Sequence, residues 1–416
     1  MNISIKARRT LPPAAAPNRL RNLLHAAGGM LSGERALNRF QEELREYFGV
    51  RHVFMVSSGM AALFVILRAL KALSPEKSNV VIPAYTCFSV PSAVIKAGLD
   101  VKLCDIDRDT MDFDYNLLPN AIGKDTLCVV PDNLFGIPSD VDRVQRLCKP
   151  HGAFVVEDAA QAMGARHKRR LIGTAGDAGF FSLARGKNIT CGSGGVIVTN
   201  SDRVAGAIDR EYSTLPSPGA AETLKELLMV VAMDVFINPS FYWLPAGLPF
   251  LKLGETRFYG DFPVERLSGM KAGLLMNWRT ELDGSNRART ENSDYFRREL
   301  GLNRAYGRMP LLRLPVVLKS AEARERVYSI ARGKGLGVST MYPSPINEIE
   351  EIKDRFPGQE YPGAKTVAEK LVTIPTHHFL KEGDRAGIRE LFHKTASCPM
   401  RGRDAVQLNT STKPAG

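Results

Sequence analysis

Cysteine is scarce in this sequence, and its spacing excludes two kinds of site. The 416 residues include six cysteines, none of which stand in the C-x-x-C spacing of zinc sites and redox motifs. Several lie in apolar runs of the kind that form buried strands. The pattern favours reduced thiols in a cytoplasmic protein over a disulfide framework. The seven histidines are scattered, so we predict no metal site.

Long uncharged apolar runs are also missing. A helix that crosses a bilayer needs about 20 apolar residues. The most apolar stretch, residues 224–253, is broken by Asp234 and three prolines. It is either a helical insertion, packed on the protein or in a subunit interface, or a patch that contacts a membrane surface. Residues 1–18 lack the continuous apolar segment of a signal peptide, and we expect them to form a flexible arm.

Acidic residues are the minority among the charges. The chain has 56 Lys and Arg against 44 Asp and Glu, which gives a formal net charge of +12. The basic residues are spread along the chain and form no block with interleaved aromatics, so we predict no nucleic-acid partner. The positive excess suits anionic partners such as nucleotides, phosphates or an acidic membrane surface.

Short apolar strands alternate with amphipathic helices through the first half of the chain. Helical patterns follow most of the strand-like runs, which stand at residues 53–56, 79–86 (a strand with its loop), 101–107 and 127–131. Such alternation predicts an α/β domain with a mainly parallel sheet and helices on both faces.

The second part of the sequence predicts a smaller α+β domain. A long helical pattern starts near residue 264 and leads into a shorter set of strands and helices. We expect the large domain at residues 19–262, with the apolar insertion at about 213–262, and the small C-terminal domain at 263–396. The polar residues 397–416 are expected to be disordered.

Two expected strands carry the candidate chemistry at their ends. Residues 155–158 (VVED) end in Asp158, and residues 179–183 (GFFSL) lead to a break at Gly186 and to Lys187. A carboxylate and a lysine are what pyridoxal phosphate needs, because the lysine holds the aldehyde as a Schiff base while the acid keeps the ring nitrogen protonated. On composition alone, an ordinary ion pair at a sheet edge is the more common explanation.

The surrounding residues resemble a known family. Residues 157–164 (EDAAQAMG), 176–188 (GDAGFFSLARGKN) and 194–195 (GG) are similar in order, spacing and residue type to the signature of the DegT/StrS-type sugar-nucleotide aminotransferases. The resemblance implies a pyridoxal-phosphate enzyme of fold type I, in the aspartate-aminotransferase superfamily. It implies a large domain around a mainly parallel seven-stranded sheet, a smaller α+β C-terminal domain, and a homodimer with sites between the subunits.

The resemblance also implies roles for three side chains. Lys187 would form the Schiff base and shuttle a proton, Asp158 would face the pyridine nitrogen, and Gln161 would reach the phenolic oxygen. Dehydratases of this family carry a histidine at the lysine position. Lys187 therefore favours transamination over dehydration.

The implied phosphate site is a turn from strand to helix. Residues 57–63 (SSGMAAL) follow an expected strand, and the free N–H groups of a first helical turn favour an anion. Met60 replaces the threonine usual in the family, so backbone contacts from Met60 and Ala61 would remain while a hydroxyl contact would not. Ser182 would donate its hydroxyl to the phosphate.

Two positions depart from the family pattern. Many relatives have an aromatic residue directly after the threonine equivalent to Thr86, stacked on the pyridine ring. Here Cys87 follows, with Tyr85 and Phe88 on either side, and of these we choose Phe88 to cover the ring. Residues 258–266 (FYGDFPVER) stand where many relatives have a Gly-x-Asn-x-Arg segment that reaches the neighbouring subunit's phosphate.

Two functions of different classes follow. The first is transfer of an amino group, with glutamate as the usual donor of the family, to a keto-sugar nucleotide in amino-sugar or polysaccharide biosynthesis. The second is a catalytically idle or regulatory relative that binds a ligand or a partner. The pair Asp158 and Lys187 favours the enzyme, while the altered positions and the insertion keep the second function open.

Overall fold

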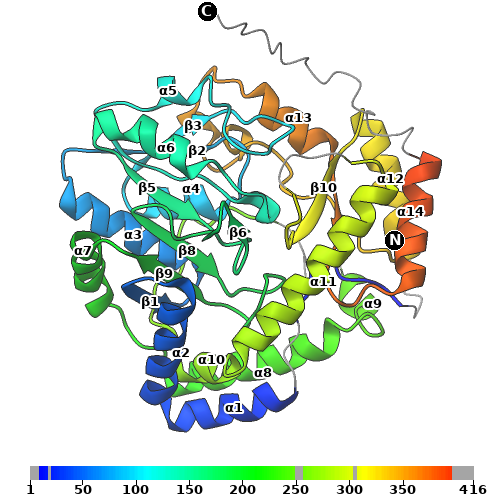
Figure 1. Cartoon of the computed structure of the whole chain (residues 1–416), viewed down its shortest axis with the longest axis horizontal. Helices are drawn as coiled ribbons and strands as arrows, with labels where there is room; N and C mark the ends of the chain where they lie inside the picture. Colours follow the sequence, from blue (N-terminus) through cyan, green and yellow to red (C-terminus); the bar gives the residue numbers. More distant parts are fainter. Residues whose placement is uncertain (1–8, 17–19, 249–255, 303–306, 396–416) are drawn as a thin grey trace, which may run out of the picture.

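The computed structural model describes residues 9–16, 20–248, 256–302 and 307–395. Its centre is a seven-stranded sheet with the order β1-β9-β8-β5-β4-β2-β3 (Figure 1). Neighbouring strands run parallel except at β9, which is antiparallel to both β1 and β8. The strands are β1 (His52–Val56), β2 (Asn79–Pro83), β3 (Asp100–Cys104), β4 (Thr126–Val129), β5 (Phe154–Asp158), β8 (Ala178–Ser182) and β9 (Gly195–Thr199).

Helices surround this sheet, and several begin at a residue that caps them. At the start of α3, for example, the Ser58 hydroxyl accepts the N–H of Ala61 at 3.0 Å, which satisfies a donor that has no partner within the helix. The helices are α1 (Leu20–Leu31), α2 (Gly33–Phe48), α3 (Gly59–Leu73), α4 (Ser89–Lys96), α5 (Leu118–Ala121), α6 (Val141–Cys148), α7 (Asp202–Ser213) and α10 (Gly269–Leu274).

Alternate residues of the strands enter two different cores. Val80 and Val156 belong to a core that includes residues of α3 and α4, whereas Val81 and Val155 belong to a core that includes residues of α5 and α6. Successive side chains of a strand point to opposite faces, so a sheet covered on both faces needs continuous apolar runs. The predicted fold, a mainly parallel sheet with helices on both faces, is confirmed.

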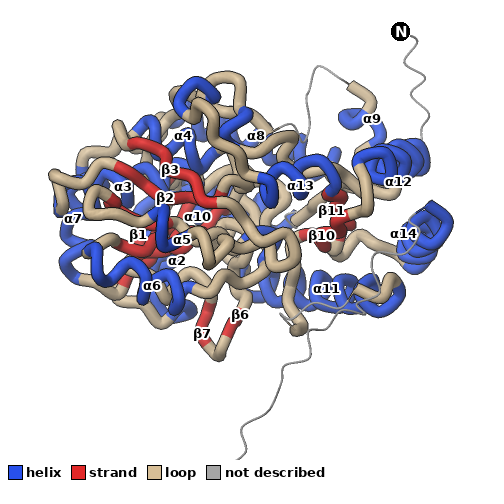
Figure 2. The backbone as a smooth tube through the Cα atoms, turned by 90° about the horizontal axis from the view of Figure 1, so that it is seen from above, coloured by secondary structure: helices blue, strands red, loops and turns tan. Residues whose placement is uncertain are grey.

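A smaller part follows, built around a two-stranded antiparallel sheet beside the long helix α11 (Figure 2). Its strands are β10 (Arg313–Val317) and β11 (Leu371–Pro375). This arrangement agrees with the α+β part that the sequence predicts after the large domain. The helices around it are α11 (Trp278–Glu299), α12 (Ala321–Lys334), α13 (Pro362–Lys370) and α14 (Glu382–Thr395).

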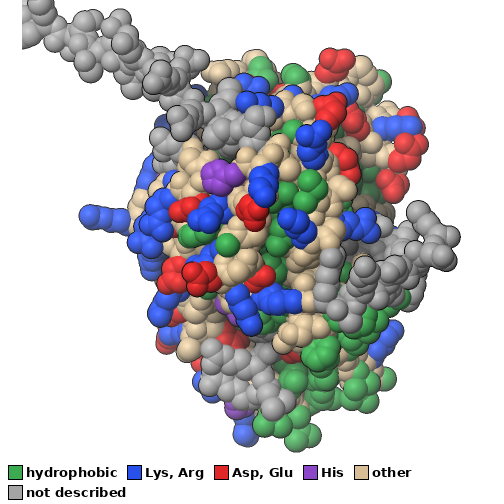
Figure 3. Space-filling view, turned by 90° about the vertical axis from the view of Figure 1, so that its right-hand side faces the viewer, with side chains coloured by type: hydrophobic (Ala, Val, Ile, Leu, Met, Phe, Trp, Pro, Cys, Tyr) green, Lys and Arg blue, Asp and Glu red, His purple; other side chains and the backbone are tan. Residues whose placement is uncertain are grey.

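The apolar insertion contains α8 (Ala220–Phe236) and α9 (Trp243–Ala246). An ion pair of 2.6 Å between Glu226 and Lys271 ties α8 to α10. None of the described helices is long and apolar enough to span a membrane. Figure 3 shows a group of apolar side chains at its lower edge. Because this view is turned about the vertical axis, the group lies at the same height as α8 in Figure 1. The exposed ones on α8 include Leu224, Leu228, Met229, Val231, Val235 and Phe236.

Residues 9–16 pack against the protein. Leu11 is buried and its N–H donates to the carbonyl of Gly335 at 2.9 Å, and Arg9 pairs with Asp384 at 3.0 Å. The prediction of a flexible arm is therefore wrong for these residues, because their partners lie more than 300 residues away and leave no local signal in the sequence. Residues 1–8 and the tail 397–416 lie outside the described residues.

Candidate active site

Asp158 and Lys187 come together at the carboxyl edge of the sheet. Asp158 is the last residue of β5, and β5 pairs in parallel with β8, whose chain continues to Lys187. Gly186 turns the chain with a φ of 72°, a left-handed conformation that favours glycine. Each of the two ionisable groups influences the pKa of the other.

Burial moves both pKa values toward neutrality. It raises the pKa of Asp158 to about 6, although Lys187 and a hydrogen bond of 2.9 Å from the Ala160 N–H oppose the change. Burial also lowers the pKa of Lys187, against the influence of Cys87, Asp158 and Asp132. The lysine of this site therefore releases its proton more readily than a lysine at the surface.

Asp132 is a second carboxyl group, to which the sequence analysis assigns no role. It follows β4, bridges to Asp158 in the strand ladder, and accepts a hydrogen bond of 2.6 Å from the Thr86 hydroxyl. Burial and Asp158 raise its pKa well above the ordinary value. The sequence did contain a signal for this residue, because Asp132 directly follows the apolar run 127–131, much as Asp158 ends its own apolar strand.

Gln161 joins two segments that lie far apart in the sequence. Its Nε2 donates to the Tyr342 hydroxyl at 3.0 Å, and its Oε1 accepts the N–H of Phe135 at 3.3 Å. The sequence analysis assigns no role to Tyr342, because this residue comes from a segment 181 positions away. The contact of Gln161 with the phenolic oxygen of the cofactor stays a prediction.

The three candidates for covering the cofactor ring have different surroundings. The Tyr85 hydroxyl donates to the backbone carbonyl of Tyr342 at 3.4 Å, and the ring of Phe88 lies 6.3 Å from that of Tyr342 in a stacked arrangement. Cys87 is the one of the three that influences the pKa of Lys187. The choice of Phe88 stays a prediction.

Ser182 lies against the turn that begins α3. A Cβ atom at Gly59 would lie 3.0 Å from the Cβ and 3.3 Å from the Oγ of Ser182, so glycine permits this close approach. The start of a 15-residue helix favours an anion through its free N–H groups and its dipole. Of the two predicted backbone donors, Met60 and Ala61, the second is already engaged by Ser58 at 3.0 Å.

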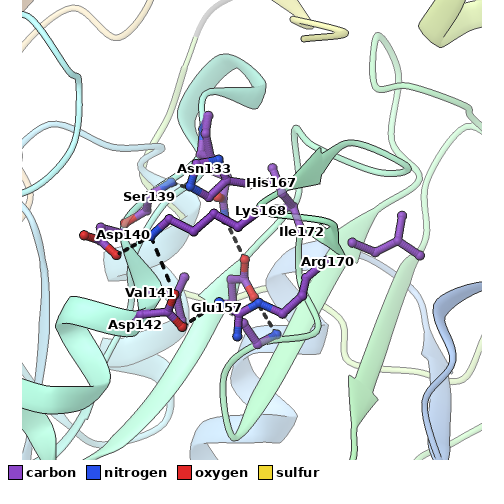
Figure 4. A pocket seen from close by; sticks show the side chains of 13 residues that line it. Asn133, Ser139, Asp140, Val141, Asp142, Glu157, His167, Lys168, Arg170 and Ile172 are labelled. Carbon is purple, nitrogen blue, oxygen red and sulfur yellow. Dashed lines mark hydrogen bonds and ion pairs between the residues drawn. The ribbon is translucent and has the colours of Figure 1, made fainter. Parts of the chain in front are cut away.

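Glu157 lies on the opposite face of β5 from Asp158. Figure 4 shows it at a small pocket beside the hairpin formed by β6 (Arg166–His167) and β7 (Arg170–Leu171). Its Oε2 accepts the N–H of Ala175 at 3.1 Å. Neighbouring residues of a strand face opposite sides, so this pocket is separate from the site at Lys187.

Arg289 holds the backbone of the lysine loop in place. This residue of α11 is fully buried, and its Nη2 donates to the carbonyls of Lys187 at 3.1 Å and Ala15 at 2.9 Å. Its Nη1 donates to the carbonyl of Leu312 at 2.8 Å. Burial lowers the pKa of Arg289 to about 9. The sequence analysis missed this residue because its three partners come from three separate segments.

The residues at this edge of the sheet fit pyridoxal phosphate. A buried carboxyl group influences a lysine of lowered pKa, and a serine lies at a close glycine turn where a helix favours an anion. Fold and site together define the class of pyridoxal-phosphate-dependent enzymes of fold type I. Residues 17–228 match the DegT/DnrJ/EryC1/StrS aminotransferase family, and the chain belongs to this family.

Curated relatives match over part of their length. The chain is 34% identical over 180 residues to the spore coat polysaccharide biosynthesis protein SpsC of Bacillus subtilis, which covers 43% of this chain and 46% of that relative. It is 29% identical over 176 residues to the GDP-perosamine synthase of Vibrio cholerae, covering 42% of this chain and 47% of that relative. The chain thus spans about half the length of the curated relatives it matches.

Solved structures share the fold over nearly the whole chain. The Helicobacter pylori aminotransferase PseC, involved in the biosynthesis of pseudoaminic acid, matches with a TM-score of 0.75 and 17% identity and covers 93% of this chain and 99% of its own. The sugar aminotransferase CalS13 of Micromonospora echinospora matches with a TM-score of 0.73 and 20% identity, covering 92% and 99%. At these identities the likeness concerns the fold.

Proposed function

We propose that this chain is an aminotransferase that uses pyridoxal 5′-phosphate to transfer an amino group from glutamate to a keto-sugar nucleotide, in amino-sugar or polysaccharide biosynthesis. The observation that carries the proposal is the environment of Lys187. This lysine is half-buried at the carboxyl edge of the sheet, and the carboxyl groups of Asp158 and Asp132 influence its pKa. Family membership supports it, and so does the likeness to a GDP-perosamine synthase.

The chain's own residues would bind the cofactor and move a proton. When bound, pyridoxal phosphate supplies an electron sink and an aldehyde that accepts an amino group. The lowered pKa of Lys187 lets its Nζ accept a proton and return it, as a general base and acid must. Asp158 would face the pyridine nitrogen and keep it protonated. The residues that would hold the cofactor are Asp158, Gln161, Ser182, Lys187, Phe88 and the backbone of Met60 and Ala61.

The visible spectrum of the purified protein tests this proposal. We expect an absorbance band of lysine-bound cofactor that changes when glutamate is added and is missing in Lys187→Ala. Lys124→Ala, which removes an exposed lysine, is the matched control and should behave as the wild type. A wild-type protein that shows no band after addition of pyridoxal phosphate would favour the second function, a catalytically idle relative that binds a partner.

We further propose that the protein is a homodimer and lies in the cytoplasm. The dimer is supported by the exposed apolar side chains on α8, where Leu228 is 63% exposed, and by Phe241, which is 52% exposed. A second copy of the chain is the occupant that we favour, and a membrane surface is the alternative. Light scattering of the double variant Leu228→Ser, Phe241→Ser should report a smaller species than the wild type. An unchanged mass together with loss of liposome co-sedimentation would favour the membrane.

A further inference from the structure

The N-terminal residues 9–16, which we call the strap, lie between the apolar insertion and the small domain. Figure 1 shows the strap as a blue trace beside α9 and α14. The N–H of Thr10 donates to the carbonyl of Pro239 in the insertion at 2.8 Å. The N–H of Leu11 donates to the carbonyl of Gly335, directly after α12, at 2.9 Å. The strap therefore joins two parts of the chain that lie far apart in the sequence.

The strap also contacts the loop that carries Lys187. A Cβ atom at Gly186 would lie 3.1 Å from the Cβ of Ala14, so the loop and the strap pass close to each other. The Nη2 of Arg289 donates to the carbonyl of Ala15 at 2.9 Å and to the carbonyl of Lys187 at 3.1 Å. Because one nitrogen makes both bonds, a shift of the strap would also change the bond that holds the lysine backbone.

His377 fastens the middle of the strap from the small domain. The imidazole is 1% exposed, its Nε2 lies 2.9 Å from the carbonyl oxygen of Pro12, and its Nδ1 accepts the N–H of Phe379 at 3.3 Å. A carbonyl oxygen can only accept a hydrogen bond, so Nε2 carries the proton and Nδ1 carries none. The ring is therefore neutral, and burial lowers the pKa of His377 to about 3. Both ring nitrogens are used in holding backbone groups.

A glycine of the small domain lets the strap lie close to it. Gly337 has a φ of 70°, and a Cβ atom there would lie 2.9 Å from the Cβ of Leu11 and 3.0 Å from the carbonyl oxygen of Pro12. A side chain at this position would push the strap away at the point where His377 holds it. The strap thus has two independent attachments to the small domain next to each other, a hydrogen bond and a close contact.

We propose that His377 is a positioning residue for Lys187, which it reaches through the strap: it holds the carbonyl of Pro12, and the strap then contacts the lysine loop at residues 14 and 15. A strap that only filled space would stabilise the whole protein alike. A strap that positions the lysine acts on the loop at residues 183–191 before it acts on the sheet. This inference rests on the proposed function for the chemical role of Lys187, whereas the contacts themselves need no cofactor.

Amide hydrogen exchange of the full chain without cofactor tests the coupling. In His377→Leu we expect exchange to quicken about 10-fold in the strap and in the loop at residues 183–191, the factor that corresponds to one lost buried hydrogen bond. Strand β2 should keep its wild-type exchange. His377→Gln retains an N–H donor and should restore most of the protection. His378→Leu, at the exposed neighbouring position, is the control and should match the wild type.

A second pair of variants releases the strap without changing the histidine. Gly337→Ala should quicken exchange in the strap and in the lysine loop as His377→Leu does. Its matched control is Gly358→Ala, because Gly358 has a similar φ of 67° but no atom of the described residues, apart from its chain neighbours, lies within 4 Å of a Cβ built there. Both variants carry the same backbone strain, so the difference between them reports the displaced strap.

The cofactor-loaded protein gives the second readout. In His377→Leu the change of the visible band after addition of glutamate should be about 10-fold slower, while the glutamate concentration for half-maximal rate changes less than about twofold. Unchanged exchange in the strap or in the lysine loop would overturn the inference, and so would equal quickening in the loop and in β2. If the wild type shows no cofactor band, the exchange results still decide the inference, and the proposed function alone fails.

Discussion

The strand β8 and the helix α8 are both rich in apolar residues, but their surroundings are opposite. All five residues of β8 are buried, whereas α8 buries Thr223 and Val230 out of its 17 residues. Strand β8 is paired along both edges by β5 and β9, while α8 is attached to α10 by the ion pair between Glu226 and Lys271. Apolar composition thus corresponds to burial in the central strand, whereas in the insertion it leaves apolar side chains exposed, which is the basis for the second copy of the chain proposed to cover them.

Truncation of a β8 side chain should produce the largest effect. Phe181 is fully buried, and its ring is stacked on that of Phe48 at 4.5 Å. We expect Phe181→Ala to lower the free energy of unfolding by about 4 kcal/mol, because it removes apolar contacts and leaves a cavity. Urea denaturation measures the loss. Leu228→Ala on α8, the matched variant, should cost about 0.5 kcal/mol or less. Equal losses in the two variants would contradict the comparison.

Removal of Arg289 should rank second. We expect Arg289→Met to lower the free energy of unfolding by about 3 kcal/mol, since three buried carbonyls would lose a charged donor. It should also lower the turnover number more than it changes the Michaelis constant for glutamate, because the lysine loop loses its anchor. Arg326→Met, at an exposed position of α12, is the control. A stable variant with normal turnover would show that Arg289 does not position Lys187.

Part of this site could be predicted from the sequence, and part could not. The positions of Asp158 and Lys187 could be predicted because Asp158 ends its strand and Lys187 follows its strand within a few residues, so that a local pattern places both at one edge of the sheet. Arg289 and Tyr342 were not predictable, because they contact Lys187 and Gln161 from segments that lie far away in the sequence. Their roles depend on how two parts of the chain pack together, which no pattern within 20 residues records.

The third effect concerns Asp158 at the carboxyl edge of the sheet, whose ionisation should make the free energy of unfolding depend on pH. Burial raises the pKa of Asp158 from the ordinary 3.8 to about 6. Between these two values the folded protein binds more protons than the unfolded chain, so stability falls as pH rises through this window. Without cofactor, the free energy of unfolding of the wild type should fall by about 2 kcal/mol more than that of Asp158→Asn between pH 4 and pH 6.5.

Asp158→Asn keeps the shape of the side chain, so the difference between the two pH profiles isolates its ionisation. Asp132 titrates nearby and its pKa is raised too, which is why the difference rather than the wild-type profile is the measurement. Parallel profiles for the two proteins would mean that Asp158 is not held in a buried place. No exposed residue of α8 should produce a comparable change.

The smallest effect should come from the ion pair that attaches α8. Lys271 is buried, with 4% of its side chain exposed, and its Nζ lies 2.6 Å from the Glu226 carboxylate and 3.0 Å from the Ser193 hydroxyl. We expect Glu226→Gln to cost about 1 kcal/mol, because the amide can still accept a hydrogen bond but no longer neutralises the lysine. Amide hydrogen exchange should quicken in α8 and stay unchanged in β8. Glu222→Gln, an exposed position one turn earlier, is the control. If exchange quickened equally in both elements, α8 would unfold together with the sheet, and the insertion would belong to the same cooperative unit as the site.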